Sequence, residues 1–314
     1  MTKYSVIGAG LAGLYAAALL RNECSSVHEL QSELPNNHRA LLRFRTNEVG
    51  KALNIPFKEV SVVKQVHTSV DKIQTAINYS LKTTGSILPR SVLSADGQTV
   101  TRYVAPADLV QKIYDRTTCA YHFHWDAEER IGQLIDSGRN IISTLPMNLL
   151  ALILDYPFKD DLECKSVSGY SRTVELVNCD FYGTIYVADP DIPFYRVSFV
   201  GDRIIVEYAQ RPDAGLGEDN FEKQLYDMLN LNDVHHLAVD PCPPLVEQRY
   251  AKILPIDDRP RKEFIHWATS KFGIFSFGRF ATWRPGLLMD DLAKDLSVIQ
   301  DIANSGQYQA LRRS

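Results

Sequence analysis

The sequence has no long hydrophobic run, no CxxC pair and no large excess of charge of either sign. Its longest apolar stretch, Leu145 to Leu154, is interrupted by Pro146 and Asn148, and we expect no membrane span because the stretch is too short. The five cysteines are scattered and odd in number, so neither a zinc site nor a disulfide framework is indicated. The formal net charge of −4 argues against binding of nucleic acid over the whole surface.

The amino-acid composition is that of an ordinary globular protein. The chain has 314 residues, enough for a sizeable core in one large or two interleaved domains. Hydrophobic residues make up 45% and charged residues 23%. A strand beginning at Tyr4 leaves no room for a cleavable signal peptide, so we expect a cytoplasmic protein with reduced cysteines.

The most informative stretch runs from Tyr4 to Leu30. It predicts a strand (Tyr4 to Ile7), a glycine turn, a helix (Leu11 to Arg21) and a second strand (Ser26 to Leu30). This order is a βαβ unit. Because the unit lies at the start of the sequence, a nucleotide-binding domain is expected to begin there.

Three glycines and one acid give this unit its predicted chemistry. Gly8 allows the tight turn, Gly10 lets the backbone approach a pyrophosphate, and Gly13 lets the helix pack on the strand. Glu29 follows at the end of the second strand, where an acid accepts hydrogen bonds from ribose hydroxyls. The pattern predicts a dinucleotide site; the alternative is that the glycines only turn a strand into a helix.

A basic segment follows the acid. Between Pro35 and Lys72 seven lysines and arginines stand against three acids, a net of +4 in a chain that is −4 overall. Such a segment suits anions, with a solvated basic face as the alternative. The alternation in LLRFRT is strand-like and places Arg43 and Arg45 on one face.

The rest of the chain predicts two domains. Strands are expected at 120–125, 131–135, 139–143, 166–177, 181–188, 194–200, 203–209, 246–256 and 273–277, and helices at 105–116, 147–154, 217–229 and 286–304. The alternating strands between 166 and 209 read as an antiparallel meander. We therefore expect an α/β fold: a Rossmann-like domain with a parallel sheet (1–50, 96–155 and 256–314) and an inserted, mainly antiparallel substrate domain (51–95 and 156–255).

Three stretches resemble the FAD-binding proteins related to glutathione reductase, and among them the amine-oxidase and UDP-galactopyranose mutase relatives. They are VIGAGLAGLYAA with Glu29, the strand Asn140 to Pro146, and GIFSFGRFATWRPGLLMDD (Gly273 to Asp291). The resemblance implies an FAD-dependent enzyme. By matching position it implies cofactor contacts from Gly8, Ala9, Gly10, Leu11, Ala12, Gly13, Glu29, Gly278, Arg279, Met289 and Asp290.

The sequence also departs from that family. Relatives carry paired glycines and an arginine soon after the ribose acid, whereas this chain has Asn36-Asn37-His38-Arg39, in which Arg39 is expected at the pyrophosphate. The chain is shorter than typical members, which implies a trimmed substrate domain. Disulfide reductase activity is not expected without a CxxC pair, and no local pattern indicates covalent flavin attachment through a cysteine.

A flavin would supply the redox chemistry, so the substrate must be inferred from the residues that are expected to face the flavin. The catalytic candidates are Tyr250, Lys252, Tyr208 and Arg196. The substrate-binding candidates are Arg45, Tyr186, Arg249, Trp283 and Arg284, with Tyr195 as a further polar aromatic candidate. Arginines and tyrosines suit an anionic or nucleotide-like substrate. His122 and His124 are expected on one strand face in a structural role, because no further metal ligand is indicated.

Three functions remain open from the sequence. The first is an FAD-dependent oxidoreductase acting at a carbon next to nitrogen, with or without C–N cleavage, on an amine-bearing or nucleotide-like small molecule. The second is a redox-neutral, mutase-like isomerase, or a compact flavoenzyme of nucleic-acid base modification similar to small phage proteins, in which segment 35–72 would meet the phosphates. The third is a non-catalytic protein resembling GTPase chaperones, against which the intact glycine turn and Arg279 argue.

Overall fold

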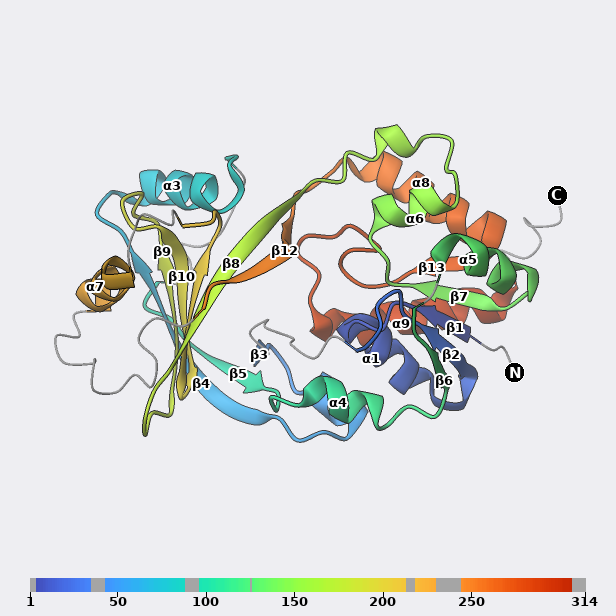
Figure 1. The fold of residues 1–314 in the computed structure, drawn as a ribbon, viewed down its shortest axis with the longest axis horizontal. Helices are drawn as coiled ribbons and strands as arrows, with labels where there is room; N and C mark the ends of the chain where they lie inside the picture. The colour runs from blue at the N-terminus through green and yellow to red at the C-terminus, as the bar shows by residue number, and fades with distance from the viewer. Residues whose placement is uncertain are drawn as a thin grey trace. The chain divides into compact units, whose positions relative to one another are not determined.

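The computed structural model describes residues 4–34, 43–87, 96–124, 126–212, 218–229 and 244–306 (Figure 1). The chain forms two compact units, each made from separated segments. Unit 1 consists of Met1–Lys58, Tyr103–Lys165 and Pro255–Ser314, and unit 2 of Glu59–Arg102 and Ser166–Leu254.

Unit 1 is built on a five-stranded parallel sheet. Its strands, in the spatial order β13-β7-β1-β2-β6, are Ile274–Ser276, Asn140–Ser143, Tyr4–Ile7, Cys24–His28 and Ala120–His122. Every residue of β1, β7 and β13 is buried, as expected for parallel strands covered on both faces. The parallel pairing brings the carboxyl ends of β1, β2 and β7 to one edge of the sheet.

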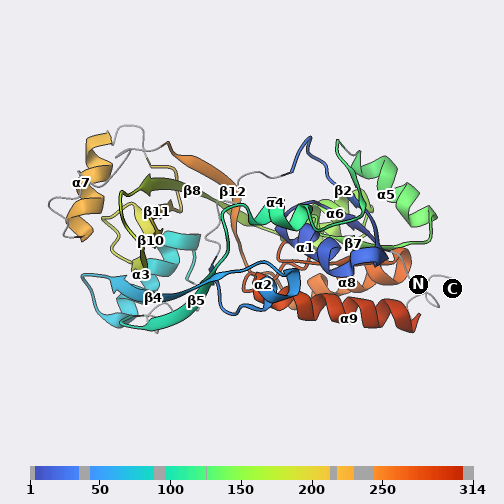
Figure 2. The ribbon, with the colours of Figure 1, turned by 90° about the horizontal axis from the view of Figure 1, so that it is seen from below.

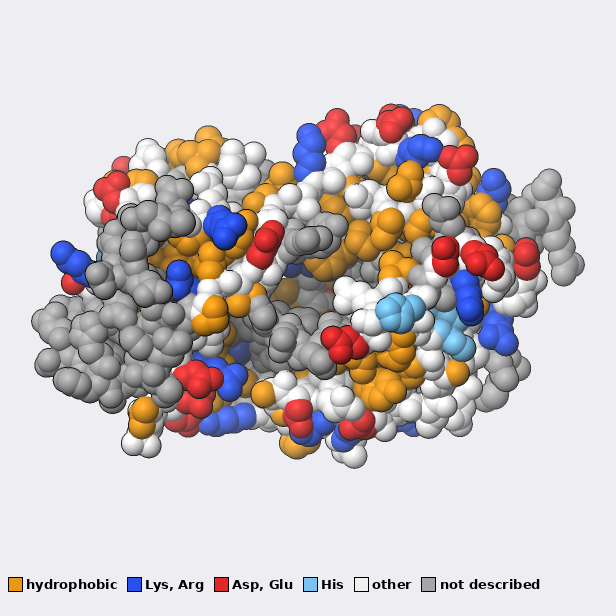
Figure 3. Space-filling model, in the orientation of Figure 1, with side chains coloured by type: hydrophobic (Ala, Val, Ile, Leu, Met, Phe, Trp, Pro, Cys, Tyr) orange, Lys and Arg blue, Asp and Glu red, His pale blue; other side chains and the backbone are white. Residues whose placement is uncertain are grey.

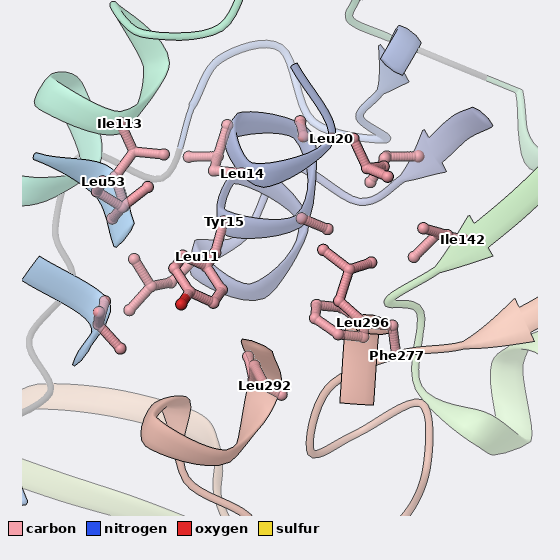
Figure 4. Close-up of a cluster of buried hydrophobic side chains, with 14 of the residues drawn as sticks. Leu11, Leu14, Tyr15, Leu20, Leu53, Ile113, Ile142, Phe277, Leu292 and Leu296 are labelled. Atoms are coloured by element: carbon pink, nitrogen blue, oxygen red, sulfur yellow. The ribbon is translucent and has the colours of Figure 1, made fainter. Parts of the chain in front are cut away.

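Helices cover this sheet and supply most of the core of unit 1. They are α1 (Leu11–Leu20), α2 (Glu48–Leu53), α4 (Leu109–Tyr114), α5 (Ala127–Asp136), α6 (Met147–Ile153), α8 (Asp258–Phe272) and α9 (Leu292–Ser305), with 3-10 turns η1 (Arg21–Glu23), η3 (Lys159–Asp161) and η5 (Met289–Asp291). Helix α1 packs on β1 and β2 and also contacts α4 and α9. In the core shown in Figure 4, Leu14 and Tyr15 of α1 lie among Ile113 of α4 and Leu292 and Leu296 of α9.

The second sheet is mostly antiparallel. Its spatial order is β12-β8-β11-β10-β9-β4-β5-β3, with the strands Val246–Ile253, Ser166–Glu175, Arg203–Tyr208, Phe194–Gly201, Phe181–Val187, Lys58–His67, Thr99–Val104 and Arg43–Phe44. Strands β4 and β9 pair parallel, and the meander from β8 to β11 is antiparallel.

In the described part of unit 2, one helix lies on each face of the sheet (Figure 2). Helix α7 (Glu218–Leu229) packs through Leu225 against a cluster that contains Val187, while α3 (Lys72–Thr84) packs through Tyr79 against a cluster that contains Tyr186. Because neighbouring residues of a strand point to opposite faces, Tyr186 and Val187 of β9 place the two helices on opposite sides.

The α/β class, with a parallel sheet and a separate mainly antiparallel sheet, is confirmed. The predicted strand at 131–135 is wrong, because these residues lie in α5. Ile131 and Leu134 are buried three residues apart, which is helical spacing, and the Asp126 carboxylate accepts a backbone N–H of the first helical turn. A short apolar run bounded by a turn fits both a strand and a helix.

Two smaller expectations also fail. His124 lies beyond the end of β6 with φ +53°, so it does not share a strand face with His122. Among the described residues, strand β3 comprises Arg43 and Phe44, and Arg45 lies in the bend that follows it. The helices α2 and α8 and the strand β4 were not predicted. Helix α8 is largely polar and buries only Phe264 and Ala268, which leaves little apolar periodicity to read.

Candidate functional site

The turn between β1 and α1 is closed by Thr144, the residue directly after β7. Gly8 has φ +93°, and a Cβ on Gly8 would lie 2.2 Å from Oγ1 of Thr144. That hydroxyl donates to the Ile7 carbonyl (2.9 Å), and the Gly8 N–H donates to the His28 carbonyl (2.7 Å). Only glycine satisfies both the backbone conformation and the space at position 8. Sequence reasoning did not identify Thr144, whose contact joins positions far apart in the chain.

The other two glycines of the turn have different surroundings. A Cβ on Gly13 would lie 1.9 Å from the Gly8 carbonyl oxygen, so the start of α1 approaches the turn as closely as backbone allows. A Cβ on Gly10 would have no heavy atom within 4 Å. Open space therefore lies in front of the first N–H groups of α1, which a helix leaves without internal acceptors. This cradle fits a pyrophosphate, and a side chain at Gly10 would fill it.

Glu29 lies beside the same cradle. Its Oε2 accepts from the Ala9 N–H (2.6 Å) and its Oε1 from the Gln31 N–H (3.1 Å). The Glu29 N–H in turn donates to the carbonyl of His122 on β6 (2.8 Å). The predicted acid is thus held at the glycine turn by backbone contacts on both sides, in a position suited to ribose hydroxyls.

The second glycine turn, after β13, lies against the first. Gly278 has φ +89°, and a Cβ there would lie 3.0 Å from the Ala12 Cβ of α1. The Gly278 carbonyl accepts from the Thr282 hydroxyl (2.7 Å), which fixes the turn. The Arg279 guanidinium lies 5.8 Å from the centroid of the Phe280 ring. The structure therefore brings the predicted Gly278 together with the predicted α1 residues.

Met289 and Asp290 lie in the turn η5, before α9. The Asp290 carboxylate accepts from the backbone N–H groups of Arg45 (3.2 Å) and Thr46 (2.9 Å). Met289 is half-buried against the core of unit 1. Burial, together with the carboxylates of Glu48 and Asp290, raises the pKa of Tyr15 to about 12, so this core hydroxyl stays protonated. In these contacts Asp290 anchors the segment that contains Arg45.

A cavity of about 740 Å³ lies in unit 1 beside the loop before α9. Trp283 and Arg284, both predicted to bind substrate, line it together with Arg261 and Lys294. Trp283 is buried with φ +46°, a conformation rare for a bulky residue. Arg261 donates to the Thr282 carbonyl (3.1 Å), and Arg284 pairs with the Asp295 carboxylate. The lining thus carries charges of both signs, because Arg261 pairs with Asp258, Arg284 pairs with Asp295, and Lys294 and Asp291 also line the cavity.

The candidates of unit 2 meet around Tyr195. Its hydroxyl donates to Oε1 of Glu207 (3.1 Å), which also accepts from the Arg196 guanidinium (2.6 Å). The Lys252 ammonium lies 3.5 Å from the centroid of the Tyr195 ring. Burial, and then the Glu207 carboxylate, raise the pKa of Tyr195. Tyr208 is not part of this cluster, because it packs in the core on the α7 side of the sheet.

Sequence reasoning missed two charged residues of unit 2. Glu207 pairs directly with Arg196 across the β10–β11 hairpin, and counting back from the Gly201-Asp202 turn would have found it. Lys82 of α3 donates to the Asp189 carbonyl (2.6 Å), and burial lowers its pKa to about 8. Among the earlier candidates, Tyr186 makes an edge contact with Tyr79 at 5.9 Å between ring centroids.

Three predicted residues have side chains that fall outside the described part of the structure. Arg39 lies outside the described residues, and Arg249 and Tyr250 lie on β12 with side chains that the structure does not describe. In the described part of the chain, no group of three His, Cys, Asp or Glu side chains is arranged to hold a metal ion. Across the described ranges, none of the helices has the length and apolar character needed to cross a bilayer.

No family model and no curated protein matches this chain by sequence. Solved structures do match it. Reduced UDP-galactopyranose mutase superposes with a TM-score of 0.66 at 12% identity, over 97% of this chain and 94% of that one. An oxidoreductase from Methanosarcina mazei gives 0.58 at 11% identity, over 96% and 100%. A CLA-producing fatty acid isomerase from P. acnes gives 0.55 at 10% identity, over 97% and 98%. This chain is similar to all three in fold.

Proposed function

We propose that this protein is an FAD-dependent enzyme whose unit 1 holds the cofactor and whose unit 2 contributes to substrate binding. The observation that carries the proposal is the double glycine cradle. Gly8 and Gly13 allow a turn and a helix start that no other residue permits, Gly10 leaves space in front of the helix, and Gly278 packs against the same helix. FAD, when bound, would supply the redox chemistry.

Each cradle residue has a role that follows from its chemistry. The N–H groups at the start of α1 would bind the pyrophosphate, where the helix dipole also favours negative charge. Glu29 would accept hydrogen bonds from ribose hydroxyls, exchanging its contact with the Ala9 N–H for them. Arg279, directly after Gly278, would add positive charge near the phosphates.

The reaction that we propose is oxidation at a carbon next to nitrogen on a polar, amine-bearing or nucleotide-like substrate. The cavity supports a polar substrate, since basic and acidic side chains line it together and can bind an anionic group and an amine respectively. In unit 2, the Lys252 ammonium over the Tyr195 ring adds positive charge, while Tyr195 and Arg196 both bind Glu207. On the face seen in Figure 3 basic and acidic side chains are interspersed, which favours a small-molecule substrate over nucleic acid.

A redox-neutral isomerase is the second candidate. It is favoured by one specific observation: two of the structures with similar folds are a mutase and a fatty acid isomerase by name. The residues named above would then bind and orient the substrate without net electron transfer to or from it.

The absorbance spectrum of the purified protein tests the cofactor. Flavin bands that are lost on denaturation are expected, and a colourless protein that takes up no added FAD would refute the proposal. Anaerobic mixing with amines and amine-bearing nucleotides then separates the two reactions. Bleaching of the flavin by substrate alone supports oxidation, whereas turnover only after reduction by dithionite supports isomerisation.

A further inference from the structure

Two thiols meet in unit 1 at the beginnings of neighbouring parallel strands. Cys24 is the first residue of β2, and Cys119 directly precedes β6. The register pairs Ser26 with Ala120, and β2 bulges at Ser25, so Cys24 is brought level with the residue before β6. Cys24 belongs to the hydrophobic core of unit 1, Cys119 packs against the same core, and each thiol changes the pKa of the other.

The two thiols have different surroundings. Cys24 is buried in the core of unit 1, and its Sγ lies 3.7 Å from the Ser26 carbonyl oxygen. Cys119 is half-exposed, and the neighbouring Cys24 thiol, followed by the Cys119 backbone N–H, lowers its pKa. The contact with Cys119, together with burial, raises the pKa of Cys24. The accessible sulfur therefore takes the thiolate form more readily, and the buried sulfur keeps its proton.

We propose that Cys24 and Cys119 form a reversible intramolecular disulfide when the protein meets a hydroperoxide. Unit 1 then carries a redox modification site distinct from the cradle at Gly8–Gly13. The inference does not depend on the FAD assignment. It assigns Cys119 the role of the attacking thiol and Cys24 the role of the resolving thiol.

The chemistry balances with hydrogen peroxide as the oxidant. The Cys119 thiolate attacks one peroxide oxygen, the O–O bond breaks, and Cys119 sulfenic acid and hydroxide form; the hydroxide takes up a proton and becomes water. The Cys24 sulfur then attacks the Cys119 sulfur, the S–S bond forms, and the S–O oxygen leaves as a second water with the Cys24 proton. Two thiols and one peroxide give one disulfide and two waters, and a dithiol reductant reverses the reaction.

The bond would join two separate segments of unit 1. It links the βαβ unit that contains the cradle to the segment that contains β6, closing a loop of roughly 95 residues. Closing a loop of this length restricts the unfolded chain more than it restricts the folded one. The oxidised protein is therefore expected to unfold at a temperature higher by roughly 5–10 °C than the reduced protein.

The test is peptide mapping of the whole protein. The purified chain is treated with a small excess of hydrogen peroxide, remaining thiols are alkylated, and peptides are analysed without reduction. A peptide pair linked through Cys24 and Cys119 is expected, and dithiothreitol should remove it. The matched control is Cys164→Ser, because Cys164 lies in the same unit and burial raises its pKa to about 12. This control should form the same link.

Two variants separate the roles of the thiols. Cys119→Ser should abolish the link, and in Cys24→Ser the sulfenic acid of Cys119 should accumulate and be trapped by dimedone. Circular dichroism of the reduced variants checks that they fold. The peptide map of the unmodified protein tests the proposal even if a variant does not fold. Full alkylation of both thiols after peroxide treatment would overturn the proposal. So would a link from Cys119 to any cysteine other than Cys24.

Discussion

Replacing Gly10 by valine tests the cradle most directly. The φ of Gly10 is −63° and its ψ is 172°, which valine adopts without strain, and a Cβ there would meet no atom within 4 Å. The fold should therefore tolerate the substitution, apart from a cost of about 1 kcal/mol for a poorer helix N-cap. The two γ-methyl groups would fill the space in front of α1 that a pyrophosphate needs.

The expected loss can be worked out from the hydrogen bonds at stake. A pyrophosphate pushed away from the first turn of α1 loses about two charge-assisted hydrogen bonds, each worth about 1.5–3 kcal/mol. The sum of about 3–6 kcal/mol corresponds to a loss of FAD affinity of roughly 10²–10⁴-fold. By contrast, Gly13→Ala would place its Cβ 1.9 Å from the Gly8 carbonyl oxygen and disturb the fold itself. A loss of FAD affinity in that variant would not separate loss of the pyrophosphate site from loss of the fold.

The assay is titration of the flavin-free protein with FAD, followed by quenching of flavin fluorescence. The matched control is Gly132→Val on α5, another glycine whose Cβ would have no atom within 4 Å. The control should retain the affinity of the unmodified protein. A Gly10→Val protein that is yellow as purified and binds FAD as tightly as the control would refute the reasoning.

Three further predictions concern charges and titration. Glu29→Ala should lower FAD affinity by about 10–100-fold through loss of the ribose acceptor, and unchanged affinity in the same titration would remove that role. Glu207→Gln should lower the free energy of unfolding by about 3 kcal/mol in urea denaturation, because it leaves Arg196 without its ionic partner in a largely buried pair; a loss below about 0.5 kcal/mol would show that solvent screens the pair. Burial, and then the charges of His122 and neighbouring arginines, lower the pKa of His28 to about 4, so the folded state favours the neutral ring. The free energy of unfolding is therefore unaffected by His28 above the unfolded pKa near 6.5, and it falls by about 3 kcal/mol as the pH drops to 4. His28→Phe should reduce this dependence on pH, whereas His266→Gln, at an exposed position, should leave it unchanged.

Much of the local architecture could be predicted from the sequence. The first βαβ unit follows from apolar periodicity and the three glycines, and the meander from its alternation and turn residues. Both kinds of signal lie within a few residues of the structure that they specify, because φ/ψ preferences and side-chain periods act locally. The short run at 131–135 was misassigned because a five-residue pattern does not separate a strand from a buried helical turn.

The sequence by itself therefore determined the fold class, the glycine turn and the acid that follows it. Only the tertiary structure decided which distant residues complete the sites. Thr144 closes the turn at Gly8, Gly278 packs on Ala12, and Cys119 meets Cys24, although each pair is separated by many residues. The physical reason is that these contacts depend on strand order in the sheet and on the packing of whole elements, which no local pattern encodes.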